Sequence, residues 1–126
     1  LRDSTSRKLL MGLPFLLYAP ETTISEIRKY ENEILQRSGL TKDDFETLFN
    51  LLIEKIIIVE KRVYAHKIYE ANKLIGHVDK GDVPFLALAL SIPNNGIWTD
   101  NIKHFGKQNM IRVWTTRDVI KLLNEG

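Results

Sequence analysis

The chain has 126 residues, of which 44% are apolar, and this is enough for one domain with a hydrophobic core. Its formal net charge is only +2, so overall charge indicates neither a nucleic acid nor an acidic partner. It contains no cysteine, which excludes disulfides and thiolate metal sites and fits a cytoplasmic location. No apolar run approaches the roughly 20 residues that span a bilayer, so no membrane is expected among its partners.

Hydrophobic periodicity predicts helices and strands that alternate along the chain. A short helix through residues 9–11 is expected first. The elements expected after it are a strand over 14–19, helices over 22–37 and 43–54, a strand over Ile56–Val59, helices over 64–75 and 82–91, strands over 96–99 and 111–114, and a final helix capped by Thr115 or Thr116. Such alternation favours a parallel sheet covered on both faces. The predicted fold class is therefore α/β, a three-layer α/β/α domain with a mainly parallel central sheet over residues 1–126.

The order of the expected elements is unusual at its start. A parallel α/β domain commonly opens with a central strand, whereas a helix is expected first here. We therefore expect a domain truncated at its N-terminus, in which the strands over 14–19 and Ile56–Val59 flank a position that this chain cannot fill.

Three acidic residues stand where expected strands end or helices begin. Glu26 lies early in the helix after the strand over 14–19, Asp82 opens an apolar helix, and Asp100 follows the strand over 96–99. Carboxylates in such places can converge on one edge of a parallel sheet, and a hard divalent cation offsets their repulsion. Taken singly, Glu26 fits a solvated helix residue, Asp82 a helix-dipole acid, and Asp100 with Asn101 a turn.

Three segments together resemble the motifs of the PIN-domain family, the ribonuclease fold that includes the VapC-type toxins. The segment 18–27 is similar to the second motif, the run 82–90 to the third, and the segment 97–105 to the fourth. The resemblance spans nearly the entire chain, but the first motif, a strand that ends in an aspartate, has no counterpart. At the fourth motif the register favours Asn101, with Asp100 as the charged candidate beside it. Asp79 is a further possible acid.

The resemblance implies a metal-dependent endoribonuclease that cleaves RNA with Mg²⁺ or Mn²⁺. Because the family includes the VapC-type toxins, it also implies a possible toxin with an antitoxin partner. Glu26, Asp82 and Asp100 are then the metal ligands. Catalytic residues are these three and Asn101. Thr99, Lys103 and Arg7 would hold the RNA backbone. A non-catalytic module of the same fold that binds RNA or protein stays open as the alternative. A homodimer is a further possibility for the partners.

The histidines and tryptophans receive plainer interpretations. His104 is expected to lie on a loop while its neighbour Phe105 packs into the core. Trp98 and Trp114 fall within expected strands, which favours core packing over stacking on bases.

Overall fold

The computed structural model describes residues 14–77 and 79–125 of the chain. The helix expected through residues 9–11 and the proposed RNA-binding residue Arg7 lie outside these residues. The chain divides into two compact units, Leu1–Val59 and Glu60–Gly126, and each is described by itself.

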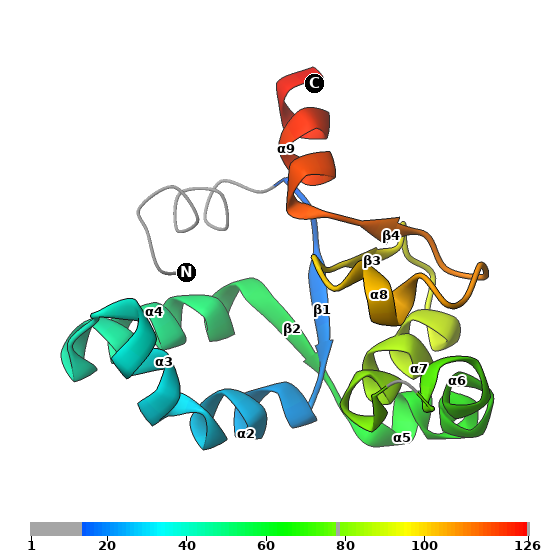
Figure 1. Cartoon of the computed structure of the whole chain (residues 1–126), viewed down its shortest axis with the longest axis horizontal. Helices are drawn as coiled ribbons and strands as arrows, with labels where there is room; N and C mark the ends of the chain where they lie inside the picture. Colours follow the sequence, from blue (N-terminus) through cyan, green and yellow to red (C-terminus); the bar gives the residue numbers. More distant parts are fainter. Residues whose placement is uncertain (1–13, 78, 126) are drawn as a thin grey trace. The chain divides into compact units, whose positions relative to one another are not determined.

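The first unit contains two strands that pair in parallel. Strand β1 (Leu17–Pro20) lies beside β2 (Ile56–Val59), with Leu17 opposite Ile56. A backbone hydrogen bond of 3.0 Å from the Glu21 N–H to the Val59 carbonyl extends the pairing past the last residue of β1. The three helices between the strands are α2 (Thr22–Lys29), α3 (Glu31–Ser38) and α4 (Lys42–Lys55) (Figure 1).

Helices α2 and α3 correct the expectation of one continuous helix over 22–37. Tyr30, between them, has φ −99° and ψ 12°, which lie outside the helical region and end the first helix. Gly39 closes α3 in the left-handed region at φ 73°, where glycine carries no Cβ penalty. The start of α4 is as expected, because the hydroxyl of Thr41 accepts from the Asp44 N–H at 3.1 Å.

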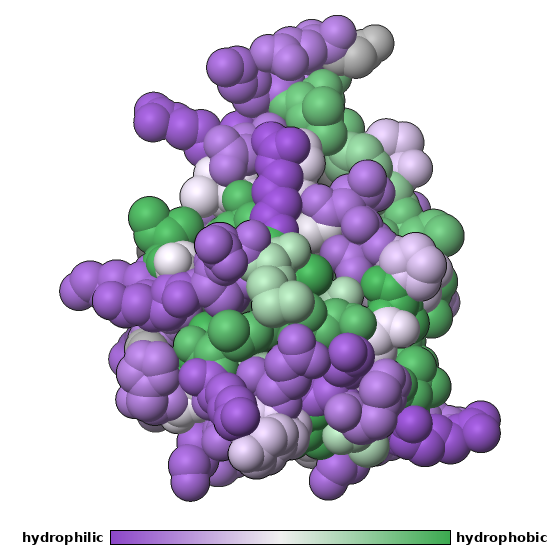
Figure 2. All heavy atoms as spheres, turned by 90° about the vertical axis from the view of Figure 1, so that its right-hand side faces the viewer, coloured by the Kyte–Doolittle hydropathy of each residue, from purple (hydrophilic) through white to green (hydrophobic). Residues whose placement is uncertain are grey.

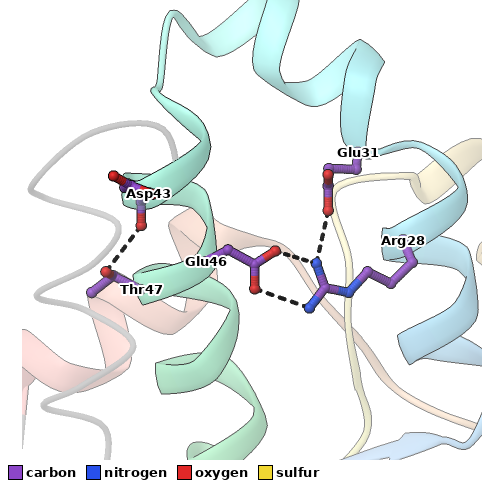
Figure 3. A network of polar contacts seen from close by, with 5 residues as sticks. All are labelled: Arg28, Glu31, Asp43, Glu46 and Thr47. Atoms are coloured by element: carbon purple, nitrogen blue, oxygen red, sulfur yellow. Dashed lines mark hydrogen bonds and ion pairs between the residues drawn. The ribbon is translucent and has the colours of Figure 1, made fainter.

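One arginine ties the three helices of the first unit together (Figure 3). The Arg28 guanidinium on α2 donates to Glu31 on α3 at 2.8 Å and to both carboxylate oxygens of Glu46 on α4. It also lies 4.0 Å from the ring centroid of Phe49, which stacks with Phe45 in the core. Two hydrogen-bonded carboxylates raise the pKa of Arg28, and the arginine lowers the pKa of Glu46.

The second unit begins with helices. Its elements are α5 (Lys61–Tyr64), η1 (Ala65–Lys67), α6 (Ile68–Ile75), η2 (Lys80–Asp82), α7 (Val83–Ser91), β3 (Ile97–Trp98), α8 (Ile102–Phe105), β4 (Val113–Trp114) and α9 (Thr116–Glu125). The expected helix over 64–75 is thus interrupted by the turn η1, and α8 is an addition within an expected loop. The core of this unit is centred on α7, where Leu86 and Ala87 are fully buried along with Ala71 and Ile75 of α6.

Strands β3 and β4 also pair in parallel, with Ile97 opposite Val113. Gly96 precedes β3 at φ 130°, and a Cβ there would lie 2.4 Å from the Arg112 carbonyl oxygen. The turn before β4 is held by the buried amide of Gln108. Its oxygen accepts from two backbone N–H groups and its nitrogen donates to two carbonyls.

These elements confirm the α/β class, because both sheets are parallel and helices connect their strands. The four described strands lie in two sheets of two strands each. In each sheet the paired strands are direct neighbours, so β1 and β2 do not flank an unfilled position, which corrects that expectation. Several large apolar side chains reach the surface, and Figure 2 shows apolar atoms among polar ones on one face. Of the helices in the described part of the chain, none is both long and apolar enough to cross a bilayer.

Candidate metal centre

Asp82 stands at the start of α7 without capping it. The backbone of Asp82 occupies the N-cap position, but its carboxylate makes no capping hydrogen bond to the helix. Instead the carboxylate oxygen Oδ2 lies 2.6 Å from Nδ1 of His104, and about a fifth of the Asp82 side chain is exposed. The simple interpretation of Asp82 as a capping acid therefore lacks its main contact.

In the segment after β3, His104 contacts Asp82 and Asn101 contacts His104. Nδ2 of Asn101 lies 2.8 Å from the same His104 Nδ1 that faces the Asp82 carboxylate. Helix α8 carries His104, and burial of its neighbour Phe105 anchors that helix in the core. The expectation for Phe105 is confirmed. His104, expected on a loop, lies on this short helix and is half-buried.

Asp79 completes the group. One of its carboxylate oxygens caps η2 by accepting from the Gly81 N–H at 2.8 Å, and the other lies 3.8 Å from His104 Nδ1. One ligand atom from each of Asp79, Asp82 and His104 lies within 4.8 Å of the other two. We call these three residues together the acid–histidine cluster.

Two further residues of the fourth motif, Thr99 and Asp100, make structural contacts. The Thr99 hydroxyl accepts from the Asn101 N–H at 3.0 Å, which fixes the bend after β3. The Asp100 carboxylate accepts from the N–H and the hydroxyl of Thr116, at 2.7 and 2.8 Å, at the start of α9. Of the two neighbours, Asn101 is therefore the one that contacts the acid–histidine cluster, while Asp100 contacts the start of α9.

A basic surface hollow adjoins the cluster. It is open to solvent, has a volume of about 390 Å³, and is lined by Ile102, Lys103, His104, Gly106 and Lys107. Lys103 was expected to contact RNA, and Lys107 is an addition that only the fold of α8 reveals. Two ammonium groups beside a carboxylate cluster are suited to a phosphodiester backbone next to a cation.

The second-motif acid is in the first unit. Glu26 is half-buried on α2, and its backbone carbonyl accepts from the Tyr30 N–H. One turn earlier, the hydroxyl oxygens of Thr22 and Thr23 are buried with no hydrogen-bond partner in the described part of the chain. The role of Glu26 as a metal ligand stays a prediction, as does that of Asp100.

The donor set of the cluster fits a divalent cation. Carboxylate oxygens are the ligands that Mg²⁺ and Mn²⁺ prefer, and an imidazole nitrogen can join them for a transition ion. The histidine was missed by sequence reasoning because it lies 22 residues from Asp82 and in an expected loop. Only the structure identifies it, because helix α8 places His104, the residue before the buried Phe105, beside the start of α7.

Parallel strands joined by helices, with an acidic cluster at a helix start beside a basic hollow, define an α/β protein with a candidate phosphodiesterase site. The family model of the PIN domain matches residues 1–124, and the chain belongs to the PIN-domain family. Searches of curated proteins and of solved structures found no match for the chain. The family is generally related to nucleases and usually uses divalent metals.

Proposed function

We propose that the chain is a metal-dependent endoribonuclease whose reaction centre includes Asp82. The observation that carries the proposal is that the Asp82 carboxylate makes no capping hydrogen bond to α7 and instead contacts His104. A hard divalent cation bound there would lower the pKa of a water molecule and neutralise charge on the phosphate.

The roles of the individual side chains follow from their contacts. Asp82 and Asp79 supply the negative charge that holds a cation, and Glu26 is proposed as a further carboxylate ligand. Lys103 and Lys107 attract the RNA backbone to the hollow beside the cluster. The Thr99 hydroxyl uses its oxygen to accept from the backbone, so its proton remains available to a phosphate oxygen.

The proposed biological setting is a toxin that acts on cytoplasmic RNA and is restrained by an antitoxin protein, with a homodimer as its possible assembly. Mg²⁺ and Mn²⁺ are both candidates for the cation. The non-catalytic alternative is a module of the same fold that binds RNA through the basic hollow alone. It is favoured by the neutral side chain of Asn101 at the fourth motif, because a site with fewer carboxylates holds a divalent cation less strongly.

The test is cleavage of a fluorescent single-stranded RNA by the purified full chain, with Mg²⁺, with Mn²⁺ and with EDTA. We expect cleavage that requires metal and is lost in Asp82→Asn. The matched control is Asp43→Asn, which removes the same charge from the first turn of α4, where Asp43 is exposed. RNA binding without metal-dependent cleavage in the wild type would instead support the non-catalytic module.

A further inference from the structure

We propose that the outward face of helices α5 and α6 binds single-stranded RNA and that the ring of Tyr69 stacks on one of its bases. The inference deepens the proposed function, because it adds a contact for the RNA outside the reaction centre, and it rests on that function only for RNA as the ligand. RNA binding, measured in EDTA and apart from cleavage, tests it.

The segment from α5 to α6 is a helical stretch with two opposite faces. Its elements α5, η1 and α6 follow one another directly, and the backbone stays in the right-handed helical region at each junction. Tyr64, Ala71 and Ile75 recur at helical spacing and are buried, so this face packs into the core of the second unit, where α6 contacts α7 (Figure 1). The opposite face is exposed to solvent.

The outward face carries basic and aromatic side chains and no acid. Its residues recur at steps of three and four and are all exposed; they are Arg62, His66, Tyr69, Lys73 and His77. We call these five residues the α5–α6 stripe. Glu60, next to the stripe, forms an ion pair with Arg62. Glu70 is likewise paired with Lys67, at 3.2 Å. The charge of this face therefore complements a phosphodiester backbone.

Tyr69 is the aromatic member of the stripe. It is 72% exposed, although the ring is an apolar surface that is favourable to bury. The Lys73 ammonium lies over the ring, 4.7 Å from its centroid, and Lys73 makes no ion pair within the described part of the chain. The ammonium occupies one face of the ring, and the other face is available to a base. A stacking surface next to a phosphate contact is the combination by which proteins hold single-stranded nucleic acid.

The surroundings of Tyr69 favour RNA over a protein partner. An acidic protein would also complement the charge of the stripe. A protein interface, however, buries its aromatic anchors within an apolar core, and the other members of the stripe are all polar. A base that stacks on Tyr69 needs only the ring itself.

The stripe leads to the acid–histidine cluster of the same unit. Its last residue, His77, precedes Asp79 by two positions, and the Asp79 N–H donates to the Ile75 carbonyl at the end of α6, at 3.3 Å. From Tyr69 to Ile75 an α-helix rises by about 9 Å. A short single strand that stacks on Tyr69 therefore reaches the cluster.

The experiment measures binding of a fluorescein-labelled single-stranded RNA to the full chain in EDTA, by fluorescence anisotropy. In Tyr69→Leu the affinity should fall about tenfold, because stacking on one base is lost. Tyr69→Phe keeps the ring and should bind as the wild type does. Thermal melting should be the same for all three proteins, since the side chain is exposed.

The matched control is Tyr30→Leu in the first unit. Tyr30 is 47% exposed and has the Lys29 ammonium 5.5 Å from its ring centroid, so it repeats the chemistry of Tyr69 and Lys73. Acidic residues follow it in the first turn of α3, and the RNA affinity of Tyr30→Leu should equal that of the wild type.

RNA with abasic sites separates stacking from charge. Abasic RNA keeps its phosphates, so wild type and Tyr69→Leu should bind it equally, both about tenfold more weakly than the wild type binds intact RNA. Lys73→Gln should instead make the dependence of log affinity on log salt less steep by about 0.7, the value for one phosphate of a single strand.

Two results would overturn the inference. Unchanged RNA affinity in Tyr69→Leu would do so and would favour a protein partner for the exposed ring, and an equal loss for intact and abasic RNA would exclude stacking. Binding through Tyr69 without metal-dependent cleavage would support the inference while overturning the proposed ribonuclease. Metal-dependent cleavage by a protein that binds RNA equally well without the Tyr69 ring would support the ribonuclease and overturn the inference.

Discussion

Replacing Asp82 by asparagine separates the two roles that an acid at the start of a helix can have. Asparagine keeps the shape and an amide oxygen that can accept from His104, but it loses the charge. No capping contact is lost, because the Asp82 carboxylate makes none to α7. Only the difference between a charged and a neutral hydrogen bond remains, so the free energy of unfolding without metal should change by no more than about 1 kcal/mol.

The effect of metal should be much larger. A ligand present at 100 times its dissociation constant stabilises a folded protein by about 2.7 kcal/mol, and the asparagine variant should lose most of this stabilisation. RNA cleavage should fall at least about a hundredfold, which corresponds to about 2.7 kcal/mol of activation free energy.

The assay combines thermal melting with and without Mn²⁺ and turnover of single-stranded RNA. Equal activity and an equal metal-induced rise in melting temperature for wild type and Asp82→Asn would refute the reasoning. A variant that unfolds without metal would also contradict it, because that result assigns the carboxylate a role in stability.

Three further changes test the fold. Gly96→Ala should destabilise the protein by more than about 1 kcal/mol in denaturant melts, because its Cβ would lie 2.4 Å from the Arg112 carbonyl; unchanged stability would contradict that contact. Leu86→Ala, at a fully buried position of α7, should cost about 2–5 kcal/mol by the same measurement, and a cost typical of surface sites would show that α7 is not the core. Glu46→Gln should lower the melting temperature at neutral pH, because the bond to Arg28 lowers the glutamate pKa. That stabilisation is present above the ordinary glutamate pKa of about 4.3 and is lost as pH falls through the folded value, so the two proteins should converge in acid.

Local patterns predicted several elements closely. The run of β-branched residues over Ile56–Val59 forms β2 with the expected bounds, because such residues favour extended backbone. Thr41 caps α4 as its sequence position indicates. The apolar helix α7 was likewise expected, since Asp82 precedes Pro84 in its first turn and apolar residues fill the rest.

Interruptions of helices were harder to predict. The apolar spacing continues through Tyr30, so periodicity gives no sign of the break there, and the break depends on one backbone conformation. The turn η1 interrupts the helix expected over 64–75, and the apolar spacing gives no sign of that interruption either. In both places the hydrophobic pattern fits a continuous helix, so it does not predict the break.

The candidate site was predicted in part. Asp82 could be identified from its place before an apolar helix, and Asn101 from the register of the fourth motif. The contacts of His104 could not, because they join residues 22 positions apart across a turn that no local signal marks. The two hydrogen bonds that Asp100 accepts from Thr116 depend on the pairing of β3 with β4, which is likewise non-local.

The location of a bound ion tests the central claim most directly. Crystals of the full chain grown with Mn²⁺ should give an anomalous scattering peak at the acid–histidine cluster, about 2.0–2.6 Å from an oxygen of Asp82. A peak elsewhere on the protein, or no peak at the acid–histidine cluster, would contradict the account.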